Sequence, residues 1–184
     1  MEPRKYDFVE VTLEPEDYDK VKEVYRLHKE QASKIFNLAS GISTDKDIME
    51  CIKNDIENNI VVLAIDTTNN KYSAVITYDN TNILDDDIVS MGVHIIVNKR
   101  YWGPESRKII FDAYKWMKEN MKPIKRLEAF VPSNNFGIIK LLKDVGFKIE
   151  GTLRNRVVYK NKDGIPTYYN ELVYSNLNLG EWYG

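Results

Sequence analysis

His94 is the side chain of this sequence best suited to move a proton at neutral pH, because an unperturbed imidazole has a pKa near 6.5. It lies in the run of residues 88–97, whose apolar and β-branched character is typical of a strand. Glu150 and Glu171 are weaker candidate bases, and they also fall in predicted strands. A lone histidine in a strand is more often structural than catalytic. The chemistry that these residue types indicate is general acid–base catalysis.

These candidates need a fold that brings their strands together, and the sequence alternates strand-like and helix-like segments. The order β-α-α-β-β-β-α-β-α-β-β predicts an α/β fold, with a mixed sheet covered on both faces, in a single domain over residues 1–184. Strands are expected at residues 8–13, 60–66, 72–78, 88–97, 127–131, 147–153 and 167–176. Helices are expected at residues 15–27 or on to 36, from Ser43 or Thr44 onward, at 103–121, and over a short segment after 135.

Composition excludes several classes of function. The formal net charge is −2, so the overall charge gives no indication that the protein binds nucleic acid or an anionic membrane. Cys51 is the only cysteine, which rules out an intramolecular disulfide, and we expect it to be packed in the core. His28 is expected at the surface. Residues 80–87 read as an acidic loop whose aspartates face solvent, and we expect no metal site.

The location of the protein follows from the same survey. The first residues are charged and lack the apolar core of a signal peptide, and the longest apolar runs are too short to cross a bilayer. We therefore expect a cytoplasmic protein.

The most distinctive stretch of the chain is residues 134–151. Apolar residues at 138, 139, 141, 142 and 145 form one face of a helix, and Gly146 stands where a helix end favours a left-handed residue. Asn135 precedes this helix, Phe147 opens the next strand, and Glu150-Gly151 follows. This order resembles the second half of the acetyl-CoA-dependent N-acetyltransferase (GNAT) fold, in the branch that acetylates the N-termini of ribosomal proteins.

The resemblance implies a function and an arrangement of the site. In the family, the fourth and fifth strands splay apart to admit the pantetheine arm of acetyl-CoA, and the loop before the third helix binds its pyrophosphate. The chain would then transfer an acetyl group directly to an amine of a protein or small molecule, with acetyl-CoA as co-substrate and no nucleic-acid or membrane partner. A homodimer would also fit.

The resemblance also assigns residues to this site. His94 is the expected catalytic base, beside the splayed strands. The residues expected to bind the co-substrate are Ile95, Ile96, Val97, Arg100, Gly103, Ser106, Arg107, Lys108 and Asn135. Tyr168 and Tyr169 could line an acceptor pocket.

The sequence departs from the family pattern at the pyrophosphate loop. Arg100 and Gly103 match the pattern, but Glu105 stands where the family has a small residue, and Pro104 removes one N–H donor. We expect the Glu105 carboxylate to repel a diphosphate. Ile138 is bulkier than the usual residue facing the cofactor, and Leu142 stands where many members have a tyrosine acid. The alternative is a non-catalytic GNAT-fold protein that serves in binding or assembly.

Overall fold

The computed structural model describes residues 5–35, 44–84, 87–160 and 165–177, and its centre is one seven-stranded sheet in the order β1-β2-β3-β4-β5-β7-β6. The strands are β1 Tyr6–Glu10, β2 Ile60–Asp66, β3 Lys71–Leu84, β4 Asp87–Val97, β5 Leu127–Pro132, β6 Lys148–Lys160 and β7 Pro166–Asn176. The helices are α1 Tyr18–Ile35, α2 Asp45–Asn58, α3 Pro104–Asn120 and α4 Phe136–Asp144, with short 3₁₀ turns at Pro15–Asp17 and Lys99–Tyr101. This is the element order that the sequence predicts.

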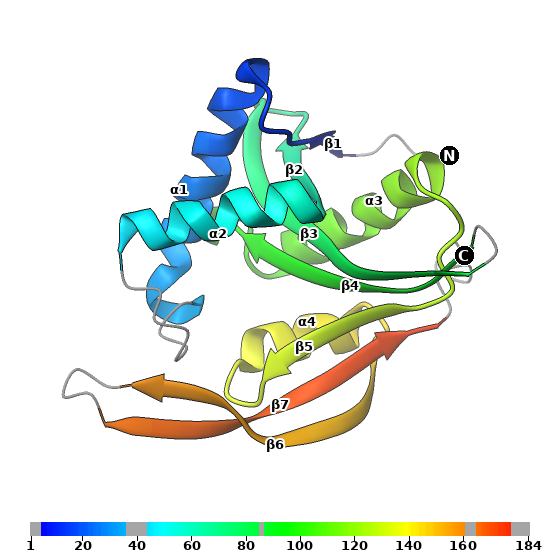
Figure 1. Cartoon of the computed structure of the whole chain (residues 1–184). Coiled ribbons are helices and arrows are strands. Elements are labelled where there is room, and N and C mark those ends of the chain that lie inside the picture. Colours follow the sequence, from blue (N-terminus) through cyan, green and yellow to red (C-terminus); the bar gives the residue numbers. More distant parts are fainter. Residues whose placement is uncertain (1–4, 36–43, 85–86, 161–164, 178–184) are drawn as a thin grey trace.

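The sheet is divided at its centre. Strands β1 to β4 pair in antiparallel fashion, and so do β5, β7 and β6. Between the two halves, β4 and β5 are parallel and pair only at Met91 with Leu127 and at Gly92 with Glu128. Beyond this point the two strands diverge, as Figure 1 shows. The expected splay between the fourth and fifth strands is therefore present.

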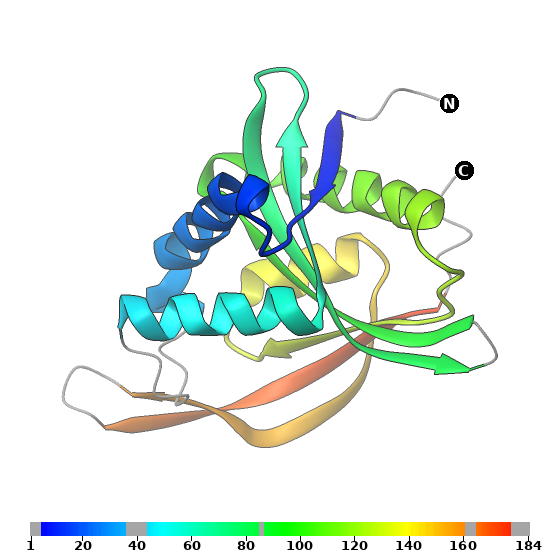
Figure 2. The ribbon, with the colours of Figure 1, turned by 45° about the horizontal axis from the view of Figure 1, so that its top comes forward.

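Helices cover both faces of the sheet (Figures 1 and 2). Helices α1 and α2 pack on one face through a cluster that includes Leu27, Ile52 and Leu63. Helices α3 and α4 pack on the other face, where the core includes Ile109 and Leu142. In α3, Ile109, Ile110, Ala113 and Met117 recur at helical spacing, which predicts an inward stripe, and all four are buried. The periodicity of the apolar residues thus identified the buried face of α3.

Local sequence signals set the ends of several helices. Helix α2 begins at a capping box, in which the Asp47 N–H donates to Thr44 Oγ1 (3.1 Å) and the Thr44 N–H donates to an Asp47 carboxylate oxygen (2.8 Å). At the C-terminal end of α4, Gly146 has a φ of 79°, so it adopts the left-handed backbone conformation that the sequence predicted at this position. Its N–H donates to the carbonyl of Lys143 (3.0 Å) and ends the helix.

Three strands differ clearly from their expected bounds, and the sixth continues past residue 153 to Lys160. The first ends at Glu10, because the chain turns at Thr12, whose N–H and hydroxyl both donate to Asp17 Oδ2 (2.8 and 2.9 Å). The third continues to Leu84, and its residues 82–84 pair with β4, so the expectation of a loop over residues 80–87 was wrong for residues 80–84 and 87. Residues 85 and 86 of that loop lie outside the described residues, and so do Gly164, expected in the turn before the last strand, and Trp182 and Tyr183, which could serve a partner interface in the non-catalytic alternative.

Candidate functional site

Two cavities meet where β4 and β5 diverge. One, of about 890 Å³, opens between α2, the middle of the sheet and the β6–β7 pair. The other, of about 840 Å³, lies between the first turns of α3 and α4. Ile95, Asn135 and Ile138 line both cavities, so the gap between the strands connects them. A long ligand could therefore reach from one cavity into the other.

The backbone of β4 turns a row of polar groups toward this gap. The Asn98 N–H donates to the Ser73 carbonyl beside β3 (2.8 Å), whereas the Met91 N–H donates to the Arg126 carbonyl on the β5 side (3.0 Å). Because successive residues of a strand point their N–H and C=O groups to opposite edges, the odd-numbered residues of β4 face β5. Ile95 and Val97 therefore present their backbone to the gap.

Ile96, the third residue expected there, faces the other way. Its backbone lies opposite Val75 of β3, and its side chain is buried in the cluster under α1 and α2. Ile96 still lines the first cavity, as Ile95 does, but its backbone groups face β3 and not the gap.

The second cavity is built around the start of α3. Gly103 lies just before the helix with a φ of 84°, a left-handed conformation that favours glycine. Ser106, in the first turn, donates its hydroxyl to the Gly103 carbonyl (2.8 Å). Gly103, Ser106 and Arg107 all line the cavity. The first turn of a helix carries N–H groups without intrahelical partners and the positive end of the dipole, which suits an anion.

Arg100 and Lys108, the other two expected cations, do not join this group. Neither lines either cavity. Lys108 instead binds Glu105, with 2.9 Å between Nζ and Oε1. Arg100 lies exposed in the 3₁₀ turn before α3. The cavity has Lys140 of α4 as a second cation beside Arg107, and the sequence analysis did not single it out.

The start of α4 forms the opposite wall. The Asn135 side chain caps the helix by accepting from the Ile138 N–H (3.4 Å). Phe136 is 76% exposed and Trp102 is 48% exposed, and both line the same cavity. The Trp102 indole is fixed in place, because its Nε1 donates to the Val97 carbonyl (2.9 Å). Flat aromatic faces at the rim of this cavity are suited to stack on a planar ring.

The first cavity contains His94, which is paired with Asp79 of β3. The distance from His94 Nε2 to Asp79 Oδ2 is 3.0 Å. The His94 side chain is 54% exposed and lines the cavity, so a ligand there could reach it. Asp79 holds the pKa of His94 above its usual value, mainly through this hydrogen bond and against the opposing effect of burial.

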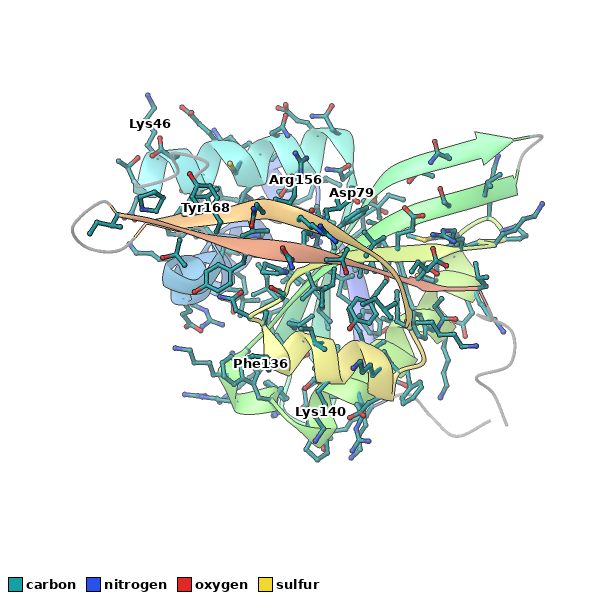
Figure 3. The ribbon with its side chains drawn as sticks, turned by 90° about the horizontal axis from the view of Figure 1, so that it is seen from below. Lys46, Asp79, Phe136, Lys140, Arg156 and Tyr168 are labelled. Carbon is teal, nitrogen blue, oxygen red and sulfur yellow. The ribbon has the colours of Figure 1, made fainter. Side chains whose placement is uncertain are left out.

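Further ionisable groups surround this pair. Asp55 of α2 and Glu171 of β7 both line the cavity, and their charges also favour the protonated form of His94. Burial raises the pKa of the Asp55 carboxyl. Arg156 of β6 lies 3.8 Å from Glu171, measured from Nε to Oε2. In Figure 3, Asp79 and Arg156 lie toward α2, whereas Phe136 and Lys140 belong to α4 on the other side. Among the charged residues that line this cavity, three are carboxylates and one is an arginine, which favours a cationic ligand over an anionic one.

Three side chains of the first cavity differ from expectation. His28 was expected at the surface, but it is 8% exposed, with its Nδ1 2.9 Å from the Val24 carbonyl, and burial lowers its pKa. Cys51 was expected in the core, but it is only partly buried and lines the cavity. Asp79 was not identified at all, since a single aspartate beside a predicted acidic loop gives no signal of its own. Its pairing with His94 depends on the register of two strands.

The fold is shared with structurally determined acetyltransferases, although the sequence matches no protein-family model and no curated protein. A ribosomal-protein-S5-alanine acetyltransferase from Vibrio fischeri has a TM-score of 0.68 at 15% identity, covering 100% of this chain and 98% of that one. An acetyltransferase from Salmonella typhimurium that modifies the N-terminal serine of ribosomal protein L7/L12 has a TM-score of 0.72 at 9% identity, covering 95% and 96%.

A third similar structure includes a ligand. It is a putative acetyltransferase from Salmonella typhimurium with its cofactor acetyl-CoA, with a TM-score of 0.62 at 11% identity, covering 97% of this chain and 96% of that one. The chain therefore has the GNAT acetyltransferase fold over its whole length, as the residues at 134–151 predicted. No helix in the described part of the chain is long and apolar enough to span a membrane.

Proposed function

We propose that the protein is an acetyl-CoA-dependent N-acetyltransferase that acts on an amine. The observation that carries the proposal is the connection of two cavities through the gap between β4 and β5. One end of this passage offers helix N-termini, Arg107 and Lys140, and the other end offers His94 among carboxylates. This arrangement would suit an anionic co-substrate at one end of the passage and a cationic acceptor at the other.

The residues of the second cavity would bind acetyl-CoA. The first turn of α3 and the Arg107 guanidinium would hold the diphosphate through N–H donors and positive charge. The exposed faces of Trp102 and Phe136 would pack against the adenine ring. Ile95 and Ile138 would flank the pantetheine arm where the two cavities meet. Pro104 removes one donor, and Lys140 adds a cation from the facing helix.

The residues of the first cavity would carry out the transfer. His94, neutral above its raised pKa, would take a proton from the acceptor ammonium. The free amine would then attack the thioester carbonyl, forming the C–N bond. The Ile95 N–H, which faces the gap, is suited to stabilise the oxyanion. The C–S bond breaks, and the thiolate leaves with the second proton of the amine, so that one proton is released overall.

The acceptor is an amine of a protein or of a small molecule. The carboxylates of Asp55, Asp79 and Glu171 favour a positively charged group over an anionic one. The two ribosomal-protein acetyltransferases that share the fold support a protein N-terminus as one member of this class.

The test is to measure thiol release from acetyl-CoA with a panel of peptide N-termini and small amines. His94→Ala should lower turnover by about 10²–10⁴-fold and leave acetyl-CoA affinity within about twofold. Unchanged turnover in a folded His94→Ala variant would show that His94 is not the base. Binding of acetyl-CoA without release for any amine would favour the non-catalytic alternative.

A further inference from the structure

Gly92 of β4 is placed directly opposite Asp79 of β3, and the glycine makes room for the carboxylate. The two residues are partners in the antiparallel register. A Cβ atom built on Gly92 would lie 2.0 Å from Asp79 Oδ1 and 3.2 Å from Asp79 Cγ. Directly opposed side chains normally stand side by side, with Cβ atoms about 5 Å apart. Here the Asp79 side chain lies across the strand in space that any other residue at 92 would occupy.

The backbone gives no other reason for a glycine at this position. The glycines of the described chain with positive φ are Gly103 and Gly146, and Gly92 is not one of them. Glycine within a strand weakens the strand and commonly marks a close approach by another group. At Gly92 that group is the Asp79 carboxylate.

The carboxylate placed over Gly92 reaches His94, which lies two residues further along β4 on the same face of the sheet. Asp79 Oδ2 is 3.0 Å from His94 Nε2, and the Asp79 side chain is only 19% exposed. The other oxygen, Oδ1, is buried against Gly92 and has no hydrogen-bond partner among the residues that the structure describes. Gly92, Asp79 and His94 therefore form one geometric unit.

We propose that Gly92 and Asp79 are a positioning pair for the base of the proposed acetyl transfer, with Asp79 holding Nε2–H of His94 and thereby leaving Nδ1 as the basic atom. A neutral imidazole has one N–H and one lone pair, and a carboxylate at Nε2 can only accept. The inference rests on the proposed function only for its predicted effect on kcat. The tautomer and the pKa of His94 can be measured without it.

A double-mutant cycle tests the unit. Gly92→Ala and Asp79→Ala should each lower kcat by about 10–100-fold, with little effect on acetyl-CoA affinity. The double variant should be no worse than Asp79→Ala alone, within about twofold, because alanine at 79 no longer fills the space above residue 92. Gly151→Ala is the matched control, since a Cβ there meets nothing within 4 Å. Losses that multiply in the double variant would overturn the proposal.

A second measurement, the NMR titration of His94, separates orientation from loss of folding and does not require turnover. The chain has two histidines, so a His94→Ala spectrum assigns the imidazole ¹⁵N signals. We expect neutral His94 to carry its proton on Nε2. The nearly isosteric Asp79→Asn should lower the pKa of His94 and move the acid limb of kcat/KM to lower pH. The other charged groups that face the ring, Asp55, Glu171 and Arg156, are unchanged in this variant.

An Nδ1–H tautomer in the wild type, or an unmoved His94 pKa in Asp79→Asn, would overturn the positioning role even if transfer occurs. Conversely, a wild type that transfers no acetyl group but shows the Nε2–H tautomer and the shifted pKa would contradict the proposed function and not the geometry of this pair.

Discussion

The Glu105 carboxylate, at the start of α3, accepts a 2.6 Å hydrogen bond from the hydroxyl of Tyr6 in β1. The same oxygen binds Lys5 Nζ at 2.6 Å, and the other oxygen binds Lys108 Nζ at 2.9 Å. These three partners hold the pKa of Glu105 at about 2. The carboxylate does not line the cavity at the helix start. It therefore connects α3 to β1 and faces away from the cavity in which the sequence analysis expected it to meet a diphosphate.

Glu105→Gln should therefore destabilise the protein without tightening acetyl-CoA binding. We expect a loss of about 1–2 kcal/mol in the free energy of unfolding at pH 7, because charged hydrogen bonds are replaced by neutral ones at a partly exposed site. The folded pKa of Glu105 is lowered, so its contribution is complete above the unfolded pKa of 4.5 and is lost as pH falls toward 2. Denaturant unfolding at pH 7 and at pH 3 measures the difference.

Glu57→Gln, on the exposed surface of α2, is the control for this substitution and should change stability by less than about 0.5 kcal/mol. A Glu105→Gln variant that is equally destabilised at both pH values, or that binds acetyl-CoA tenfold more tightly, would contradict the role assigned to Glu105.

Arg107 and Lys108 are adjacent in sequence but should differ in their effect on ligand affinity. Arg107 lines the second cavity, whereas Lys108 is bound to Glu105 outside it. Arg107→Ala should weaken acetyl-CoA binding by about tenfold at low ionic strength, and less at high salt, because the lost interaction is electrostatic. Lys108→Ala should change affinity by less than about twofold. Equal effects of the two substitutions in calorimetric titrations would show that the ligand does not approach α3 as proposed.

His28 should make the fold sensitive to mild acid. Burial lowers its pKa, so the unfolded chain binds a proton near pH 6.5 that the folded chain resists. Its stabilising contribution is present above pH 6.5 and is lost as pH falls below that value, by up to about 1.4 kcal/mol per pH unit. The pKa of His94 is raised, so its contribution to stability has the opposite pH dependence. Because His94 is present in both the wild type and His28→Gln, its contribution cancels when the two proteins are compared.

The measurement is thermal or denaturant unfolding of these two proteins between pH 8 and pH 5.5. The stability of the wild type should fall relative to that of His28→Gln as pH decreases. Parallel pH profiles would show that His28 is protonated as easily in the folded protein as in the unfolded one.

The sequence predicted those features that neighbouring residues determine. Asn135 and Gly146 flank one helix, and the structure shows the first as its cap and the second in the left-handed conformation that ends it. The inward stripe of α3 followed in the same way from helical periodicity. Because many such local signals occurred in a known order, the fold and the splay of β4 and β5 could be predicted.

Features that depend on distant contacts could not be predicted. Glu105 turns away from the cavity because Lys5 and Tyr6, about a hundred residues earlier, lie beside it in the folded chain. Asp79 meets His94 only through the register of β3 and β4. In these cases residue type suggested a role, but the direction of each side chain was set by long-range packing.

The central claim is that acetyl-CoA occupies the gap between β4 and β5, and calorimetric titration of a variant with a filled gap tests it most directly. Ile138 lines both cavities, so Ile138→Trp should block the passage between them. Ile149→Trp is the control, because Ile149 is 54% exposed and lines neither cavity.

We predict one acetyl-CoA site with a micromolar Kd, or about −8 kcal/mol, in the wild type and in Ile149→Trp, and at least tenfold weaker binding in Ile138→Trp. No binding to the wild type at millimolar acetyl-CoA, or undiminished binding to a folded Ile138→Trp variant, would contradict the account.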